Sequence, residues 1–321
     1  MKYICGAYTS APSLNNASIR SEAEFYSNIN LIKQIKGLEI PFWGENCHPF
    51  GNSFLNSYLK KDWKNSLTCI PCMVTANKLD DKIGLASTDE GSRLIALQIH
   101  KKAYESFLEF NNHFGINIFE NIHLSSAPCH QQQNSSVSSF TKSLEEIIKW
   151  NWDSSKIFIE HCDKYNLEGR FEKGYLSLEE EILAIKNVAS NNIGFVVNTG
   201  RSSIEGKKIE TVNEHIELIC NHNIPVGIIF SGTSNVDNCP LKWKDLHVPF
   251  GCFDTSKFPY KNSILSKSNV KKIFNNLEHF LNQINFFGFK LMPLDPKNAS
   301  IKKRIGINED AIKVLNSFLN K

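Results

Sequence analysis

Charged side chains follow an apolar run in the segment KIFIEHCDK, residues 156–164. Residues 157–159 are apolar, and Glu160, His161 and Asp163 come directly after them. Such a run is typical of a parallel strand buried on both faces, and these sheets place reactive groups just beyond the carboxyl ends of their strands. A carboxylate and an imidazole there could transfer a proton or bind a cation, although one strand end of this kind also fits an ordinary polar loop.

Two further charges lie inside apolar segments, Glu39 in LEIPF and Lys290 in FFGFKLM. An unpaired charge in a protein interior is costly, so we expect these side chains to contact each other, Glu160 or a bound ligand, unless they point outward to a helix interface. A carboxylate whose pKa is raised by burial can remove a proton from a carbon next to a carbonyl group. The predicted catalytic residues are Glu160, Glu39, Lys290 and His123.

Two glycine-containing loops follow the next predicted strands, NTGRSSIEG at 198–206 and SGTSN at 231–235. Free backbone amides beside the guanidinium of Arg201 could hold an anion, although such loops are also common turns. We therefore predict a small acidic or phosphorylated ligand. The predicted substrate-binding residues are Arg201, Asn198, Ser231, His161 and Trp43.

These residues need elements that carry them to one place, and the chain alternates short apolar runs with longer amphipathic segments. The predicted strands cover residues 3–8, 38–42, 67–74, 118–124, 157–159, 193–197, 226–230 and 286–292. The predicted helices cover 22–35, 89–111, 138–149, 178–188, 209–220, 269–284 and 309–319, and the Ser-x-x-Glu caps begin at Ser21, Ser87 and Ser177.

About eight strand-helix units predict an α/β fold, a (β/α)8 TIM barrel that forms a single domain over residues 1–321. An open doubly wound sheet is the alternative. The first predicted strand is followed by TSAPSLNN, which lacks the glycine-rich phosphate loop of that fold.

Composition limits the partners. The 321 residues include 36 Lys or Arg and 33 Asp or Glu, a net charge of +3, and so small an excess predicts no nucleic-acid partner. Nine cysteines, an odd number, predict free thiols in a reducing compartment and a cytoplasmic protein. The start MKYICGAYTS does not fit a signal peptide, and no run reaches the roughly 18 apolar residues of a membrane helix.

One cysteine pair, Cys69 and Cys72, has the C-x-x-C spacing of zinc and redox sites. The sequence has no second pair of this spacing, and the motif lies inside the strand-like run SLTCIPCMV. We therefore predict that these thiols are structural.

Several segments resemble a bacterial protein family of unassigned function. They are KYICGAYTSAP, LEIPFWG, IFIEHCD, EKGYLSLEEEI, NTGRSSIE, SGTSN and WKDLHVP. That family is similar in turn to the xylose-isomerase-like TIM barrels, which include sugar isomerases, ketose epimerases and endonuclease IV. The resemblance covers nearly the whole chain.

The resemblance implies a divalent metal, Mn, Mg or Zn, held by Glu, Asp, His and Glu at the ends of strands five to eight. Glu160 matches the first position, but Asn198, Ser231 and Lys290 stand at the other three. Two alternatives remain open. Either a different set holds the metal, or no metal is used and Lys290 supplies the positive charge. The alternative metal ligands are Glu160, His123, Asp245 and His247.

We predict a sugar or sugar-acid isomerase or epimerase that transfers a proton beside a carbonyl group at the carboxyl-terminal mouth of the barrel. A metal-independent lyase or hydrolase of a small anionic carbohydrate and a non-catalytic sugar-binding barrel are the alternatives. The incomplete ligand pattern and the nearly balanced charge argue against a nuclease like endonuclease IV. None of these patterns specifies the sugar or the oligomeric state.

Overall fold

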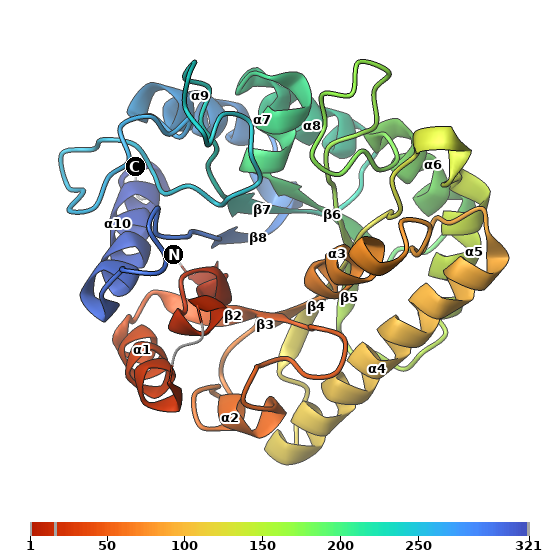
Figure 1. Cartoon of the computed structure of the whole chain (residues 1–321), viewed down its shortest axis with the longest axis horizontal. Coiled ribbons are helices and arrows are strands. Elements are labelled where there is room, and N and C mark those ends of the chain that lie inside the picture. Colours follow the sequence, from red (N-terminus) through yellow and green to blue (C-terminus); the bar gives the residue numbers. More distant parts are fainter. Residues whose placement is uncertain (1, 16–17, 320–321) are drawn as a thin grey trace. The chain divides into compact units, whose positions relative to one another are not determined.

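The computed structural model describes residues 2–15 and 18–319. It contains eight parallel strands, which are neighbours in chain order in one closed barrel. The predicted barrel is therefore confirmed. The strands, labelled in Figure 1, are β1 Tyr3–Cys5, β2 Ile35–Pro41, β3 Asn65–Thr68, β4 Phe119–Leu124, β5 Lys156–Glu160, β6 Ile193–Asn198, β7 Val226–Phe230 and β8 Ile284–Phe289.

Helices connect the strands. The α-helices are α1 Ile19–Leu31, α2 Asn52–Asn56, α3 Ile70–Leu79, α4 Glu90–Phe114, α5 Val137–Ile147, α6 Leu178–Val188, α7 Thr199–Gly206, α8 Glu210–Asn221, α9 Lys267–Leu277 and α10 Ile301–Leu319. Four 3-10 turns accompany them, η1 Ala7–Thr9, η2 Pro12–Asn15, η3 Gln131–Gln133 and η4 Leu281–Gln283.

The chain divides into two compact units. The first comprises Met1–Glu39, Asp62–Lys64 and Val197–Lys321. In this unit β8 pairs with both β7 and β1, with Lys290 directly after its last residue, and α1 packs against α10 (Figure 1). The residues of β1 and β7 are all buried, as expected for strands covered on both faces.

The second unit comprises Ile40–Lys61 and Asn65–Val196. Here β3, β4 and β5 pair in parallel, and α5 packs against α6. The long helix α4 begins after Asp89, whose side chain accepts the amide of Ser92, and ends at Gly115, which adopts the left-handed conformation (φ 69°) that glycine favours.

The Ser-x-x-Glu patterns predicted the start of one helix correctly and the starts of two others wrongly. The capping box of Ser177 and Glu180 begins α6 as predicted. By contrast, α1 is capped by Ser18 and α4 by Asp89, so the predicted caps at Ser21 and Ser87 are wrong by a few residues. Several Ser and Asp residues crowd these helix starts, and any of them could accept the free amides.

The run at 67–74 was wrongly predicted to be one strand. β3 ends at Thr68, Cys69 is the N-cap of α3, and Pro71 lies in the first turn, where its missing N–H is not needed. Cys69 and Cys72 are therefore at a helix start, where both are buried and the Cys72 thiol donates to the Cys69 carbonyl oxygen (2.9 Å). Similarly, the loop predicted at 198–206 is helix α7.

Candidate active site

Glu39 and Lys290 form a buried ion pair in the first unit. Glu39 lies within β2 and Lys290 directly after β8, and their residue exposures are 2% and 0%. The Lys290 Nζ lies 2.7 Å from Glu39 Oε1. The sequence left several possible partners for these two charges. The structure shows that Glu39 and Lys290 contact each other.

The ion pair is closely surrounded by residues of the segment after β1. The Lys290 Nζ lies 5.7 Å from the centre of the half-buried Tyr8 ring. Burial raises the pKa of the Cys5 thiol well above its usual value, and the negative charge of Glu39 raises it further. At Gly6, a Cβ atom would lie 3.0 Å from Lys290 Cγ and 3.3 Å from Glu39 Oε2.

The contacts at Gly6 lead to a prediction. We expect Gly6→Ala to displace the Lys290 side chain and to cost about 1–3 kcal/mol of stability, because a methyl group is forced into a packed interior. Urea denaturation measures this loss. Gly91→Ala is the matched control because its Cβ would contact only Asp89 Oδ1, at 3.4 Å. Equal effects of the two substitutions would contradict the prediction.

A second polar group in the first unit joins the residues after β6 and β7. The Arg201 Nε donates to Asp245 Oδ2 (3.2 Å), and the side chains are 4% and 8% exposed. His247 Nδ1 lies 2.9 Å from the Ser231 hydroxyl and 3.7 Å from Asp245 Oδ1. The structure therefore brings together Arg201 and Ser231, two predicted substrate-binding residues, with Asp245 and His247, two predicted metal ligands.

The amides expected to hold an anion already have partners within the protein. Asn198 Oδ1 caps α7 by accepting the amides of Gly200 (3.1 Å) and Arg201 (3.4 Å). In the second loop, the Ser231 amide donates to Thr199 Oγ1 (3.0 Å) and the Gly232 amide to the Val248 carbonyl oxygen. With Asp245 beside the Arg201 guanidinium, this region offers much less positive potential than the sequence suggested.

In the second unit, His123 and Glu160 lie at the ends of adjacent strands, β4 and β5, and neither is exposed. His123 is paired in register with Phe158, and their rings are 6.5 Å apart. Because side chains alternate along a strand, His123, Phe158 and Glu160 share one face of the β4–β5 pair.

His161 is held by a helix instead. Its Nδ1 lies 2.7 Å from Glu181 Oε2 on α6, and the other oxygen of Glu181 accepts the Ser126 hydroxyl. All three residues are buried. His161 follows Glu160, and alternation along the strand directs it to the opposite face, where it anchors α6 to β5. Its role in substrate binding stays a prediction. Sequence reasoning missed Glu181 because it resembles the acidic residues usual in a first helical turn.

Asp163 also stabilises local structure. Its carboxylate accepts the amides of Glu172 (2.6 Å) and Lys173 (3.1 Å), and its carbonyl oxygen accepts that of Tyr175. Trp43, by contrast, is half-buried and lines a hollow of about 310 Å³ together with Glu45, Asn46, His48 and Pro49.

The four-ligand metal set implied by the resemblance does not fit the residues present. Asn198 uses its side-chain oxygen to cap α7, and Lys290 is a cation paired with Glu39. The alternative set is also weakened, because Asp245 pairs with Arg201. In the second unit, His123 and Glu160 each offer a suitable ligand atom.

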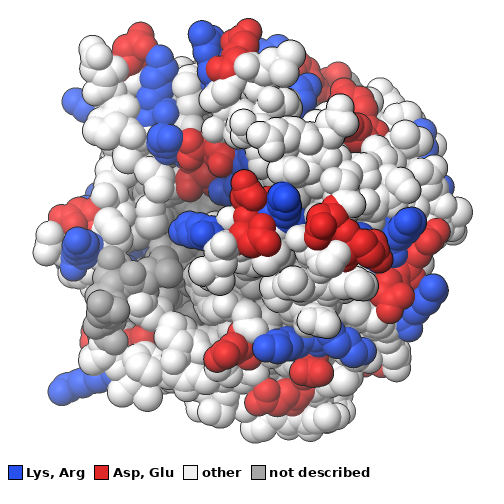
Figure 2. All heavy atoms as spheres, turned by 45° about the vertical axis from the view of Figure 1, so that its right-hand side comes forward, with Lys and Arg blue, Asp and Glu red and all other residues white. Residues whose placement is uncertain are grey.

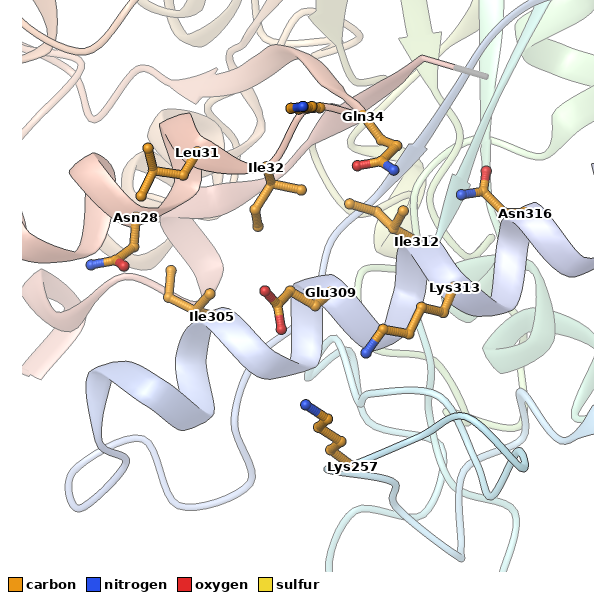
Figure 3. Close-up of a pocket in the computed structure, with 11 residues that line it drawn as sticks. Asn28, Leu31, Ile32, Gln34, Lys257, Ile305, Glu309, Ile312, Lys313 and Asn316 are labelled. Atoms are coloured by element: carbon orange, nitrogen blue, oxygen red, sulfur yellow. The ribbon is translucent and has the colours of Figure 1, made fainter.

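A larger groove, of about 590 Å³, lies in the first unit between the end of α1 and the outer side of α10 (Figure 3). Gln34 lines it directly before β2 begins, so it is near the amino end of that strand. Barrel enzymes place their chemistry at the carboxyl ends, and we therefore assign no catalytic role to this groove.

Positive and negative side chains are interspersed on the face shown in Figure 2. Exposed lysines in the first unit pair with nearby acids, as in Lys267 with Asp254 (2.9 Å) and Lys272 with Glu210 (2.8 Å). Within residues 2–15 and 18–319, no helix has the length and apolar character needed to cross a bilayer.

The thiols differ in predicted reactivity. Burial raises the pKa of Cys220 to about 11, whereas hydrogen bonds from Tyr260 and the Leu241 amide lower the pKa of the partly exposed Cys239. Because the thiolate is the nucleophile, we expect iodoacetamide to modify Cys239 at a lower pH than Cys220. Peptide mass spectrometry across a pH series measures this order, and Tyr260→Phe should reduce the difference. Earlier modification of Cys220 would contradict the prediction.

Comparison with known proteins gives two matches over nearly the whole chain. A family model described as a domain of unknown function (DUF4862) matches residues 4–307. The uncharacterized protein STM3670 of Salmonella typhimurium (strain LT2) is 29% identical over 314 residues, covering 98% of this chain and 96% of that protein.

Solved structures of similar fold include sugar epimerases. A D-tagatose 3-epimerase-like protein has a TM-score of 0.62 at 14% identity, covering 100% of this chain and 99% of its own. D-psicose 3-epimerase, solved in the presence of D-fructose, has a TM-score of 0.59 at 14% identity and full coverage of both chains. The IOLI protein, described with a zinc atom, has a TM-score of 0.55 at 13% identity, covering 99% of each. At these identities, the similarity confirms the (β/α)8 barrel fold alone.

Proposed function

This chain belongs to the DUF4862 family, and from its fold we propose that it is a carbohydrate isomerase or epimerase that moves a proton beside a carbonyl group. The observation that carries the proposal is the Glu39–Lys290 ion pair, which is almost completely buried. A buried pair is often no more stabilising than apolar side chains of the same size, so a role in chemistry accounts for its presence.

In the proposed mechanism, Glu39 removes the proton from the carbon next to the carbonyl group. The Lys290 ammonium stabilises the negative charge that develops on the enediolate oxygen, and the low dielectric of the interior strengthens this interaction. The proton then returns to a carbon of the enediolate, which gives an isomer or an epimer.

The proposed mechanism uses no metal, because the implied ligand positions carry Asn198, Ser231 and Lys290. A metal-dependent version would use His123 and Glu160 as ligands, and the zinc described for the IOLI protein is the reason to test it. We further propose a neutral sugar as substrate, because the loop amides expected to hold an anion are bonded within the protein. The nine free cysteines fit a cytoplasmic location.

Hydrogen exchange tests the proposal whichever isomer or epimer is formed, because the C–H bond beside the carbonyl group breaks in each case. We would incubate the purified protein with neutral aldoses, ketoses and sugar acids in D2O, and follow the loss of C–H signals next to the carbonyl group by proton NMR. We expect exchange with at least one neutral sugar and a loss of about 100-fold or more in Glu39→Gln. Cleavage fragments would indicate a lyase or hydrolase.

Metal dependence is measured on the same samples. We expect exchange to survive EDTA, and elemental analysis to find no stoichiometric metal. Loss of exchange with EDTA and recovery with Mn or Zn would support the metal-dependent version. If no sugar exchanges with or without metal, but sugars raise the melting temperature, the chain is a sugar-binding barrel and the proposed activity is wrong.

A further inference from the structure

The loop after β2 forms a distinct hollow in the second unit, which we call the β2 hollow. It is lined by Trp43, Glu45, Asn46, His48 and Pro49 and has a volume of about 310 Å³. This volume lies at the lower end of the range of small-molecule pockets, which starts at about 300 Å³. The mechanism proposed above assigns these residues no chemical step.

The backbone of the β2 hollow is fixed by a tight turn. The Trp43 amide donates to the Asn46 carbonyl oxygen (3.0 Å), and Gly44 has φ 112°, which few other residues tolerate. The Cys47 amide then donates to Asn52 Oδ1 (2.7 Å), and Asn52 in turn donates to Glu109 Oε2 on α4 (2.6 Å). The loop is thus tied to the long helix.

The His48 side chain, which also lines the hollow, is held in place by its neighbours. The His48 ring stacks on Phe54 of α2, with 4.2 Å between ring centres and 13° between planes, and its Nδ1 accepts the Phe50 amide (3.2 Å). His48 is 3% exposed. A pocket that keeps its shape without ligand loses little ordering entropy on binding.

The side chains in the hollow suit a sugar ring. Trp43 supplies a half-buried aromatic surface, and the exposed Glu45 and Asn46 supply hydrogen-bonding groups beside it. The C–H groups on one face of a sugar ring pack on an aromatic ring, while its hydroxyls bind carboxylate and amide groups. No lysine or arginine is among the described residues that line the hollow, and Glu45 repels anions.

We propose that the β2 hollow is a binding subsite for one neutral sugar ring. Resting on the proposed function, this inference adds a place for a neutral sugar ring that takes no part in the reaction.

NMR titration tests the subsite separately from turnover. In 15N-labelled protein the five tryptophans give five indole N–H signals, and Trp43→Phe and Trp150→Phe assign two of them. The probes are methyl glucoside, methyl galactoside, maltose, lactose, glucuronic acid and glucose 6-phosphate. We expect a neutral probe to shift the Trp43 signal saturably and to leave the Trp150 signal unchanged.

Variants complete the test. Trp43→Ala should lower the affinity about tenfold or more, as expected for a central aromatic contact, whereas Trp150→Ala, a half-buried tryptophan elsewhere in the same unit, should retain it. Asn52→Ala should weaken binding because it frees the loop. Glu39→Gln should still bind at Trp43, so failure of the proposed chemistry would not affect this readout. A static Trp43 signal with every probe, or tighter binding of the phosphate than of neutral sugars, would overturn the proposal.

Discussion

Replacing Lys290 with methionine should lower the free energy of unfolding by about 3–5 kcal/mol, the usual cost of leaving one member of a buried ion pair without its partner. The Glu39 carboxylate would remain in the interior, 2% exposed, with its main positive neighbour removed. Urea denaturation measures the change. Lys297→Met, an exposed lysine after the same strand, is the control and should change stability by less than about 0.5 kcal/mol.

A second substitution separates stability from chemistry. In Glu39→Leu combined with Lys290→Met no charge of the pair remains, so we expect stability to return to within about 1 kcal/mol of the wild type or to exceed it. The double variant should not catalyse exchange of the sugar C–H group with D2O, because it lacks both Glu39 and Lys290. If Lys290→Met alone is as stable as the wild type, the two charges are not interdependent, and the proposed mechanism loses its central observation.

The barrel could be predicted from the sequence because each strand and each helix has its own local pattern, and the patterns repeat along the chain. Each strand of a parallel barrel is buried on both faces and reads as an apolar run, and each helix is amphipathic. The prediction was wrong where one run held two elements, at 67–74, since Cys, Ile, Met and Val are as apolar in a buried helix as in a strand. Periodicity alone does not separate these cases.

Candidate site residues were predictable only as single residues. A charge within an apolar run must have a partner, and Lys290 is the one of several partners considered for Glu39 that the structure places beside it. The partner of His161 could not be predicted, because Glu181 lies on a helix whose orientation depends on packing. The amides of 198–206 were wrongly expected to be free, because Asn198 was read as a ligand rather than as a helix cap.

Substitution of Arg304 should also have a large effect on stability. Nothing in the sequence around Arg304 predicted its structural role. It is 3% exposed on α10, and its guanidinium donates to four carbonyl oxygens that all precede it in the chain. The acceptors are Ser10 (2.9 Å), Ala11 (3.1 Å), Ala299 (3.1 Å) and Pro296. Burial lowers the pKa of Arg304, and the charge of Glu22 partly offsets this shift.

These bonds hold the segment after β1 against α10. Asn308, one helical turn after Arg304, donates to the Ser10 hydroxyl (3.0 Å), and Thr9 donates to the Leu291 carbonyl oxygen (2.7 Å), directly after Lys290. The segment also carries Tyr8, whose ring lies beside the Lys290 ammonium. Arg304 is thus placed to fix the surroundings of the ion pair without contacting it.

We expect Arg304→Lys to lower the free energy of unfolding by roughly 2–4 kcal/mol, because a lysine ammonium cannot reach four carbonyl groups in a planar fork and leaves buried acceptors unsatisfied. Arg170→Lys, an exposed residue, is the same chemical change and should cost less than about 0.5 kcal/mol. Amide hydrogen exchange should accelerate at Thr9 and Ser10, whose amides donate to Gly6 and Ala7 within this segment. If their protection is unchanged while global stability falls, Arg304 supports α10 alone, and the segment after β1 is held by its own turns.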